Sequence, residues 1–319
     1  MGSRTAVAGP DTLSVSWTRT GRLLAAASED GFVRVWDGDR GAVKASLLHE
    51  VGKRGPRGTW GVRAAIAPDG KTVASANLSR PDVILWDVAS GKKIATLSTP
   101  AGNVRDLRFL TDEWLLEFRG ERLLARRLAG DRSRVFDLGK LLPSTHALFA
   151  ITLSGDGSVL ALFDGKKATT HRVLIHPDGL ALSLVATIGA ELSLPTMALS
   201  HDGRLLAVYD AGKRPYRELT IYDAATGVQK YWLLWRKSSG LPNVDSMCFL
   251  PDGKTLAVGG TDVVRLYDLG SRAERAWIST PWVRGLAISG DGKSLAAGFR
   301  HQASLRIWDV AGLQQPNGN

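Results

Sequence analysis

Two short phrases recur at a near-constant spacing along this chain of 319 residues. One is a tight turn followed by small residues, as in PDGKTVASA from Pro68 and PDGKTLAVG from Pro251. The other is an aromatic residue followed by aspartate and, four residues later, by glycine, as in WDGDRG from Trp36 and WDVASG from Trp86. Either phrase alone is weak evidence, so the recurrence is what restricts the possible folds.

The glycines of the first phrase align at Gly21, Gly70, Gly157, Gly203, Gly253 and Gly292. One interval is twice as wide, and FLTDEWLLEF from Phe109 fills it, with Glu113 in place of the glycine. Seven units with a period of about 45 residues therefore cover nearly the whole chain, and this period is typical of four-stranded propeller blades.

Each unit divides into four short strands. In the second unit they are expected at Val62–Ala67, Thr72–Ala76, Val83–Trp86 and Lys93–Leu97. The links are short and no helical apolar period is present, so neighbouring strands should pair as an antiparallel meander. Such a sheet is apolar on both faces and must stack against others around an axis.

The sizes of the repeated side chains suit that arrangement. The second strands are rich in alanine and glycine, which fit the narrow inner part of a tapering assembly. The aromatic residues of the third strands can fill the wider gap between neighbouring sheets. Trp232, in WLLWRK, is likewise expected to lie in the core.

These motifs resemble the WD-repeat family over residues 5–310. The matching pairs are Trp36-Asp37, Trp86-Asp87 and Trp308-Asp309, with the variants Tyr222-Asp223 and Tyr267-Asp268. The resemblance implies an all-β fold, a seven-bladed β-propeller of four-stranded antiparallel blades, and a scaffold that commonly binds peptides at the mouth of its channel.

The chain departs from the family pattern in three respects. The family's Gly-His pair before each first strand is absent, so its buried Asp-His-Ser/Thr-Trp hydrogen-bond chain cannot be assumed here. The third unit has RLLARRL where Trp-Asp belongs, and Phe136-Asp137 falls in its fourth strand. The fourth unit ends its third strand with Ile175-His176.

The chain ends predict how the ring closes. Only VAGLQQPNGN follows Asp309, whereas TAVA at Thr5–Ala8 precedes the first unit. We therefore expect the N-terminal segment to complete the last blade beside Leu305–Trp308. Residues 1–4 resemble a cloning remnant, 5–310 a single propeller domain and 311–319 a polar tail.

Composition limits the function classes. The net charge is +10 and the pI about 9.9, which favours anionic partners through long-range attraction. The histidines lack metal-ligand spacing, and no nucleophile elbow or phosphate-binding glycine loop is present. We expect no enzyme activity, no cofactor and no metal. A propeller hydrolase or lactonase is the least favoured class.

The composition also gives expectations for the cellular compartment and the source of the protein. The single cysteine, Cys248, excludes an internal disulfide and suits a reducing compartment, so a cytoplasmic location is expected. The protein is also expected to be a monomer. No apolar run reaches the length of a membrane span. The bias toward Ala, Gly and Arg fits a GC-rich bacterial genome.

The strongest functional expectation concerns one face. Loops that join blades and loops between second and third strands should emerge together, and we call this surface the loop face. Tryptophan and arginine are common interface anchors. The partner-binding residues expected there are Trp60, Asn103, Arg105, Asn243, Asp245, Trp282 and Arg284. Local packing of the two tryptophans beneath loops is an equal alternative.

Two functions follow. The leading one is a non-catalytic scaffold for a peptide or protein partner of unknown identity on the loop face. The alternative is an anionic ligand, either nucleic acid or a phosphopeptide, bound by the basic loop face. The residues for that alternative are Lys53, Arg54, Arg57, Arg80, Lys213, Arg214, Arg236 and Lys237.

Overall fold

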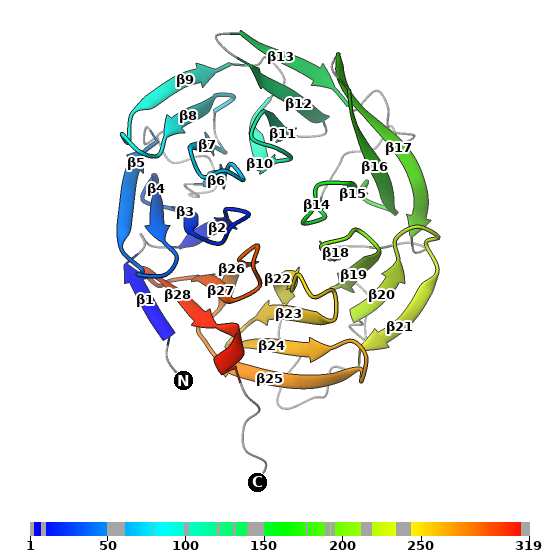
Figure 1. The fold of residues 1–319 in the computed structure, drawn as a ribbon. Coiled ribbons are helices and arrows are strands. Elements are labelled where there is room, and N and C mark those ends of the chain that lie inside the picture. Colours follow the sequence, from blue (N-terminus) through cyan, green and yellow to red (C-terminus); the bar gives the residue numbers. More distant parts are fainter. Residues whose placement is uncertain are drawn as a thin grey trace. The chain divides into compact units, whose positions relative to one another are not determined.

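The computed structural model describes residues 3–7, 11–49, 61–78, 80–98, 102–119, 122–129, 132–138, 150–176, 178–188, 192, 195–211, 219–233 and 244–313. Within them the strands form seven four-stranded antiparallel sheets (Figure 1). The predicted fold class, a seven-bladed β-propeller, is confirmed. The chain divides into two compact units, which are described separately.

Unit 1 comprises Met1–Asp137 and Pro281–Leu313 and contains four of the sheets. Blade 1 is β2 (Thr12–Trp17), β3 (Leu23–Ser28), β4 (Phe32–Asp37) and β5 (Val43–Leu48). Blade 2 is β6 (Val62–Ile66), β7 (Thr72–Asn77), β8 (Val83–Asp87) and β9 (Lys93–Leu97). Blade 3 is β10 (Val104–Phe109), β11 (Trp114–Arg119), β12 (Arg122–Ala129) and β13 (Arg132–Asp137). Blade 7 is β26 (Val283–Ile288), β27 (Ser294–Phe299), β28 (Ser304–Asp309) and β1 (Ser3–Val7).

Unit 2 comprises Leu138–Thr280 and Gln314–Asn319 and contains the other three sheets. Blade 4 is β14 (Ala150–Leu153), β15 (Val159–Phe163), β16 (Ala168–His176) and β17 (Gly179–Ile188). Blade 5 is β18 (Pro195–Leu199), β19 (Leu205–Asp210), β20 (Leu219–Asp223) and β21 (Gln229–Leu233). Blade 6 is β22 (Val244–Phe249), β23 (Thr255–Gly260), β24 (Val263–Asp268) and β25 (Ala273–Ser279).

The N-terminal strand completes blade 7, as predicted. β1 pairs antiparallel with β28, with Thr5 opposite Arg306 and Val7 opposite Ser304. β1 begins at Ser3, two residues before the expected boundary. At the other end, the 3-10 helix Val310–Gly312 follows β28, and Leu313 after it is buried. Among the described residues there is no helix long and apolar enough to cross a membrane.

The Trp-Asp phrase forms a capped turn. Asp87 accepts hydrogen bonds from the Ser90 amide (2.8 Å) and the Ser90 hydroxyl (2.6 Å), and these bonds lower the pKa of the Asp87 carboxyl. Gly91 closes the turn at a φ of 67°, a left-handed conformation that glycine adopts without steric cost. The same aspartate cap recurs at Asp37, Asp223 and Asp268.

Aromatic residues of the third strands fill the gaps between blades within each unit. Trp36 is fully buried and packs with Leu305 and Ile307 of blade 7. Its sheet contributes Ala26, also fully buried, to the same cluster. The predicted gradient from small to large side chains is therefore present. The expectation for Trp232 is wrong, because this residue lies on the outer strand β21 and is 52% exposed.

Blade 2 contains the His-Ser-Trp part of the buried Asp-His-Ser/Thr-Trp hydrogen-bond chain, which was not predicted from the sequence. The Ser75 hydroxyl bonds His49 Nδ1 (2.8 Å) and accepts from Trp86 Nε1 (2.8 Å), and Ser75 and His49 are buried. His49 stands far ahead of the first strand rather than in a Gly-His pair beside it. Blade 1 has Ala26 at the position of Ser75, and Trp36 Nε1 has no hydrogen-bond partner among the described residues.

Candidate functional site

The described part of the chain includes only some of the predicted site residues. Asn103, Arg105, Trp282 and Arg284 lie in unit 1, and Asp245 lies in unit 2. Of the residues predicted for an anionic ligand, Arg80 is described and its side chain is exposed. The remaining predictions lie outside the described residues: Lys53, Arg54, Arg57, Trp60, Lys213, Arg214, Arg236, Lys237 and Asn243.

The first strands of unit 1 contain β-bulges at equivalent positions. β26, β2, β6 and β10 lie side by side in this order (Figure 1). In three of these strands the pairing register skips the second residue. The skipped residues are Leu13 in β2, Arg105 in β10 and Arg284 in β26. In unit 2, the register of β22 skips Asp245 in the same way. Because a bulge redirects a side chain and leaves its residue unpaired, these positions are suited to contact a partner.

Arg63 of β6 connects two of these bulges. Its Nη1 donates to the carbonyl of Leu13 at 2.9 Å, and its Nε donates to the carbonyl of Arg105 at 3.3 Å. The guanidinium therefore ties blade 2 to blades 1 and 3 through the residues that their ladders leave unpaired. Burial lowers the pKa of Arg63, as do the charges of Arg108 and Arg284, whereas Asp106 raises it.

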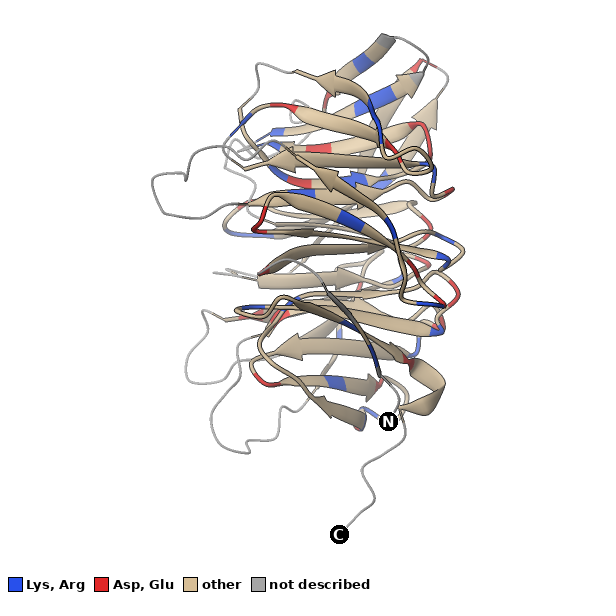
Figure 2. Ribbon diagram, turned by 90° about the vertical axis from the view of Figure 1, so that its left-hand side faces the viewer, with Lys and Arg blue, Asp and Glu red and all other residues tan. Residues whose placement is uncertain are grey.

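The four first strands carry an excess of positive charge. They contain four arginines and a single acidic residue, Asp106. Asp106 forms an ion pair with Arg108 of the same strand, with a nitrogen–oxygen distance of 3.0 Å. Acidic and basic residues occur together along most of the other described strands and turns (Figure 2). β12 and β13 are an exception, because they contain five arginines and one acidic residue, Asp137. The arginine excess is thus shared by the first strands of unit 1 and by β12 and β13 of blade 3.

Arg284 is the arginine of this set with an unsatisfied buried atom. Its Nε is buried and has no hydrogen-bond partner among the described residues. Glu29 lies near enough for the Arg284 charge to lower its pKa. Burial and the neighbouring Asp11 outweigh that effect, so the pKa of Glu29 is raised. Asp11 also accepts a hydrogen bond from the His301 amide.

The other predicted loop-face residues of unit 1 differ in exposure. Asn103 and Arg105 are exposed, at the entry to β10. Trp282 is partly buried, and the Arg300 guanidinium stacks on its ring at 4.5 Å from the centroid. Trp282 is therefore held by a cation–π contact at the start of β26. It is neither freely exposed nor a fully buried core residue.

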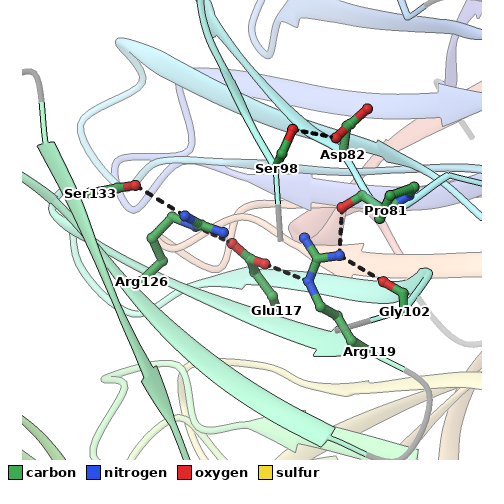
Figure 3. Close-up of polar contacts among 8 residues, drawn as sticks. All are labelled: Pro81, Asp82, Ser98, Gly102, Glu117, Arg119, Arg126 and Ser133. Atoms are coloured by element: carbon green, nitrogen blue, oxygen red, sulfur yellow. Dashed lines mark hydrogen bonds and ion pairs between the residues drawn. The ribbon is translucent and has the colours of Figure 1, made fainter. Parts of the chain in front are cut away.

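A buried charged cluster supports the loops beside β10 (Figure 3). Arg119 is fully buried, and its Nη1 donates to the carbonyls of Pro81 (2.5 Å) and Gly102 (2.8 Å). Glu117 receives Arg119 Nε at 2.7 Å and Arg126 Nε at 2.5 Å. Because Pro81 follows Arg80 and Gly102 precedes Asn103, this cluster fixes the backbone beneath two predicted site residues.

This cluster replaces the serine–tryptophan pair of blade 2. Trp86 lies opposite Val73, and Ser75 follows two residues later. In blade 3, Arg126 lies opposite Leu115, and Glu117 follows two residues later. Arg126 and Glu117 therefore occupy the positions of tryptophan and serine. The irregular RLLARRL segment is the third strand of its blade, with Arg126 as the substitute for tryptophan.

No group of three or more His, Cys, Asp or Glu side chains that could hold a metal ion occurs in the described ranges. The histidine at the tryptophan position of blade 4, His171, is buried, and its Nε2 bonds the Thr169 hydroxyl at 2.9 Å. His171 is therefore a packed residue of the sheet.

Comparison with known proteins agrees with the repeat. The family model "WD domain, G-beta repeat" matches residues 6–37. This stretch runs from β1 through blade 1 to Asp37. The chain is a seven-bladed β-propeller, and this stretch of it is similar to a WD repeat.

Two further similarities relate this propeller to known proteins. WD repeat-containing protein VIP3 of Arabidopsis thaliana is 36% identical over 105 residues, which is 28% of this chain and 30% of that protein. The β-propeller domain of Cps50 (Swd1) from Myceliophteria thermophila superposes with a TM-score of 0.70 at 17% identity, over 96% of this chain and 98% of that one. The second similarity shows the fold alone.

Sequence reasoning missed several residues that organise this propeller. Arg63 and Arg108 were not among the predicted site residues, although VR opens β6, β10 and β26 alike. That shared dipeptide was the available signal for Arg63, whereas Arg108 lies outside it. Glu117 was also missed, although it is the only acidic residue at its position in the small-residue strands.

Proposed function

We propose that this propeller is a non-catalytic scaffold that binds a peptide or protein partner on its loop face. WD-repeat propellers generally bind proteins, which supports the class of function. The observation that carries the proposal is the placement of Arg105 and Arg284 at equivalent β-bulges in the first strands of blades 3 and 7, both in unit 1.

The rigidity of the surroundings supports this proposal. Arg63 donates to the backbone carbonyls of Leu13 and Arg105, which are both at β-bulges. Arg119 donates to the backbone carbonyls of Pro81 and Gly102. A partner that docks there meets side chains whose supporting backbone is already ordered. Little conformational entropy would then be lost on binding, which favours affinity.

The anionic-ligand alternative has less support at its predicted residues. Arg80 alone of that set is described, and it is exposed at the bend after β7. Loss of affinity with rising salt would identify phosphate contacts. A salt titration with a generic oligonucleotide therefore separates this alternative from a scaffold that binds peptides.

Joint replacement of Asn103 and Arg105 by alanine should weaken capture of the partner about tenfold or more, because interface anchors commonly contribute over 1.4 kcal/mol each. The measurement is a quantitative pull-down from the source cell, followed by a binding titration with the recovered protein. The matched control is joint replacement of Arg19 and Arg22, which are exposed at the turn after β2.

Both double variants should melt at the temperature of the unmodified protein, because the side chains removed are exposed and form no hydrogen bonds among the described residues. Equal capture by the Asn103/Arg105 variant and the unmodified protein would contradict the loop-face assignment. Loss of capture in the Arg19/Arg22 variant alone would transfer the site to the opposite face.

A further inference from the structure

The outer edge of blade 4 differs from the outer edges of the other blades. β17 is the last strand of its sheet, and no strand among the described residues pairs with its outer edge. We propose that β17 pairs antiparallel with β17 of a second copy of this chain and so joins two propellers into a dimer. This inference goes beyond the proposed function, and the dimer departs from the monomeric state expected from the sequence.

The hairpin of β16 and β17 is longer than its counterparts in the other blades (Figure 1). The ladder between β15 and β16 ends at Arg172, whereas β16 and β17 remain paired as far as His176 and Gly179. In blades 1, 2, 5 and 6 an aspartate-capped turn follows the aromatic residue of the third strand. In blade 4, Arg172 follows His171 and the strand continues. Blade 4 therefore has a two-stranded extension that reaches past its inner strands.

The other six outer strands each carry a charged residue, namely Arg4, Lys44, Lys93, Arg134, Lys230 and Arg275. Lys44, Lys230 and Arg275 stand at β-bulges, where the pairing register skips them. A charge and a bulge on an edge strand both oppose pairing with another chain. β17 contains no charged residue, and the residue at its bulge is Val185. Its edge therefore lacks the charge that protects the other blades.

Apolar side chains on this hairpin are exposed. Leu184 and Val185 of β17 are 49% and 36% exposed, and Leu174 and Ile175 of β16 are exposed as well. A long, uncharged and apolar edge strand is the kind that pairs with another chain. A second strand along β17 would bond the amides and carbonyls that point away from β16, and it would cover part of this apolar surface.

The sequence of β17 is complementary to itself. In an antiparallel pair centred on Leu182, Leu180 of one copy lies opposite Leu184 of the other. Ala181 of one copy then lies opposite Ser183 of the other. The leucines share one face and the small residues share the opposite face, because residues that lie opposite each other point to the same side of a sheet. Leu180 is buried, so the exposed Leu184 of one copy would be placed beside a covered position of the other.

A second copy is the occupant that the charges favour. The net charge of the chain is +10, and copies that meet at outer strands carrying lysine or arginine repel one another. Pairing through β17 places no charged residue of either copy in the new ladder. A two-fold pair also occupies both edges, so association stops at the dimer.

Analytical ultracentrifugation of the full chain at about 1 to 100 μM measures this association. The average mass of the unmodified protein should reach twice that of the monomer within this range. Leu184→Lys should raise the Kd of the dimer about tenfold or more, because it introduces a charge into an uncharged ladder. Ile94→Lys is the matched control, since Ile94 is exposed at the bulge of β9, and it should leave the Kd unchanged.

A charge pair tests the register of the two strands. Ser183→Lys should weaken the dimer, and the addition of Ala181→Glu should restore it, because these positions face each other across the two-fold axis. Equal melting temperatures at low protein concentration show that the variants fold.

Several results would overturn the inference. A monomer mass at every concentration would do so, as would a dimer that persists unchanged in Leu184→Lys. A mass that rises beyond that of the dimer, or a loss in Ser183→Lys that Ala181→Glu does not reverse, would contradict two-fold pairing centred on Leu182. Binding of an extended apolar peptide to a protein that stays monomeric would assign the edge to a different partner. None of these results depends on capture by the loop face, so the scaffold function is tested separately.

Discussion

Replacement of Glu117 by glutamine should lower the free energy of unfolding by about 3–5 kcal/mol, the range for breaking a buried ion pair. Glu117 is fully buried, and its two carboxylate oxygens accept from Arg119 and Arg126, whose side chains are 0% and 3% exposed. The substitution keeps the shape but removes the negative charge. Two buried guanidinium groups then lose the carboxylate that both of them bind.

Urea unfolding followed by circular dichroism measures this loss. Glu113→Gln is the matched control in the same blade, because Glu113 is exposed and its distance to Arg127 is 3.5 Å. It should change the free energy of unfolding by less than about 0.5 kcal/mol. A loss below 1 kcal/mol for Glu117→Gln would contradict the role assigned to the buried cluster.

A double variant provides a second test of the buried cluster in case Glu117→Gln does not fold. Glu117→Ser combined with Arg126→Trp recreates the side chains that blade 2 has at these positions. The pair should cost less than Glu117→Gln alone, because only Arg119, rather than both Arg119 and Arg126, is then left buried without the carboxylate. A cost equal to or greater than that of the single variant would contradict the equivalence between the two blades.

Lowering the pH from 7 toward 4 should destabilise the protein by up to about 3 kcal/mol through His171 alone. Burial lowers the pKa of His171 from 6.5 to about 4. Between these values the unfolded chain binds the proton more readily than the folded protein does. The stabilisation is therefore complete above pH 6.5 and is lost as the pH falls toward 4.

The surroundings of His171 explain the direction of this effect. The side chain is 1% exposed, and Nε2 bonds the hydroxyl of Thr169. Nδ1 is buried without a hydrogen-bond partner among the described residues. Protonation would place a positive charge in a buried site that offers the ring a single hydrogen-bond partner among the described residues, the Thr169 hydroxyl, and burying a charge in this way is costly.

Urea titrations at several pH values between 7 and 4 measure this dependence in the unmodified protein and in His171→Phe. The variant should lose the part of the slope that lies between pH 6.5 and 4. His176→Gln is the control, because His176 is exposed near the tip of the same hairpin, and it should retain the slope. Equal slopes in His171→Phe and the unmodified protein would contradict this assignment.

Local turn chemistry explains why much of the fold could be predicted. In blade 2, the expected strands agree with β6–β9 to within one residue at each end. Pro68-Asp69-Gly70 and the Asp87–Gly91 turn mark these ends in the sequence itself. The closing strand was also predictable, because the last unit lacked a fourth strand and the N-terminus supplied an unused one.

Features that depend on strand register could not be predicted. The role of Glu117 follows from the register between β11 and β12. Arg126 lies opposite Leu115, and Glu117 stands two residues after Leu115. His49 reaches Ser75 across 26 positions of the chain. Trp232 was misplaced because an apolar residue on an outer strand has the same local sequence as one that packs between blades.

The candidate site was predictable only in part. Arg105 and Arg284 were recognised from their column in the aligned repeats, and the structure places both at β-bulges. Arg63 belongs to the same column but was missed, because its contacts are with the backbone of two other sheets. Such contacts follow from packing between blades, which no single repeat encodes.

Hydrogen–deuterium exchange of the full chain, with and without its captured partner, tests the central claim most directly. Docking on the loop face of unit 1 predicts slower exchange in peptides that cover residues 102–109 and 282–288. Slower exchange confined to the turns at residues 18–22, 68–71 and 290–293 would place the partner on the opposite face and contradict the account.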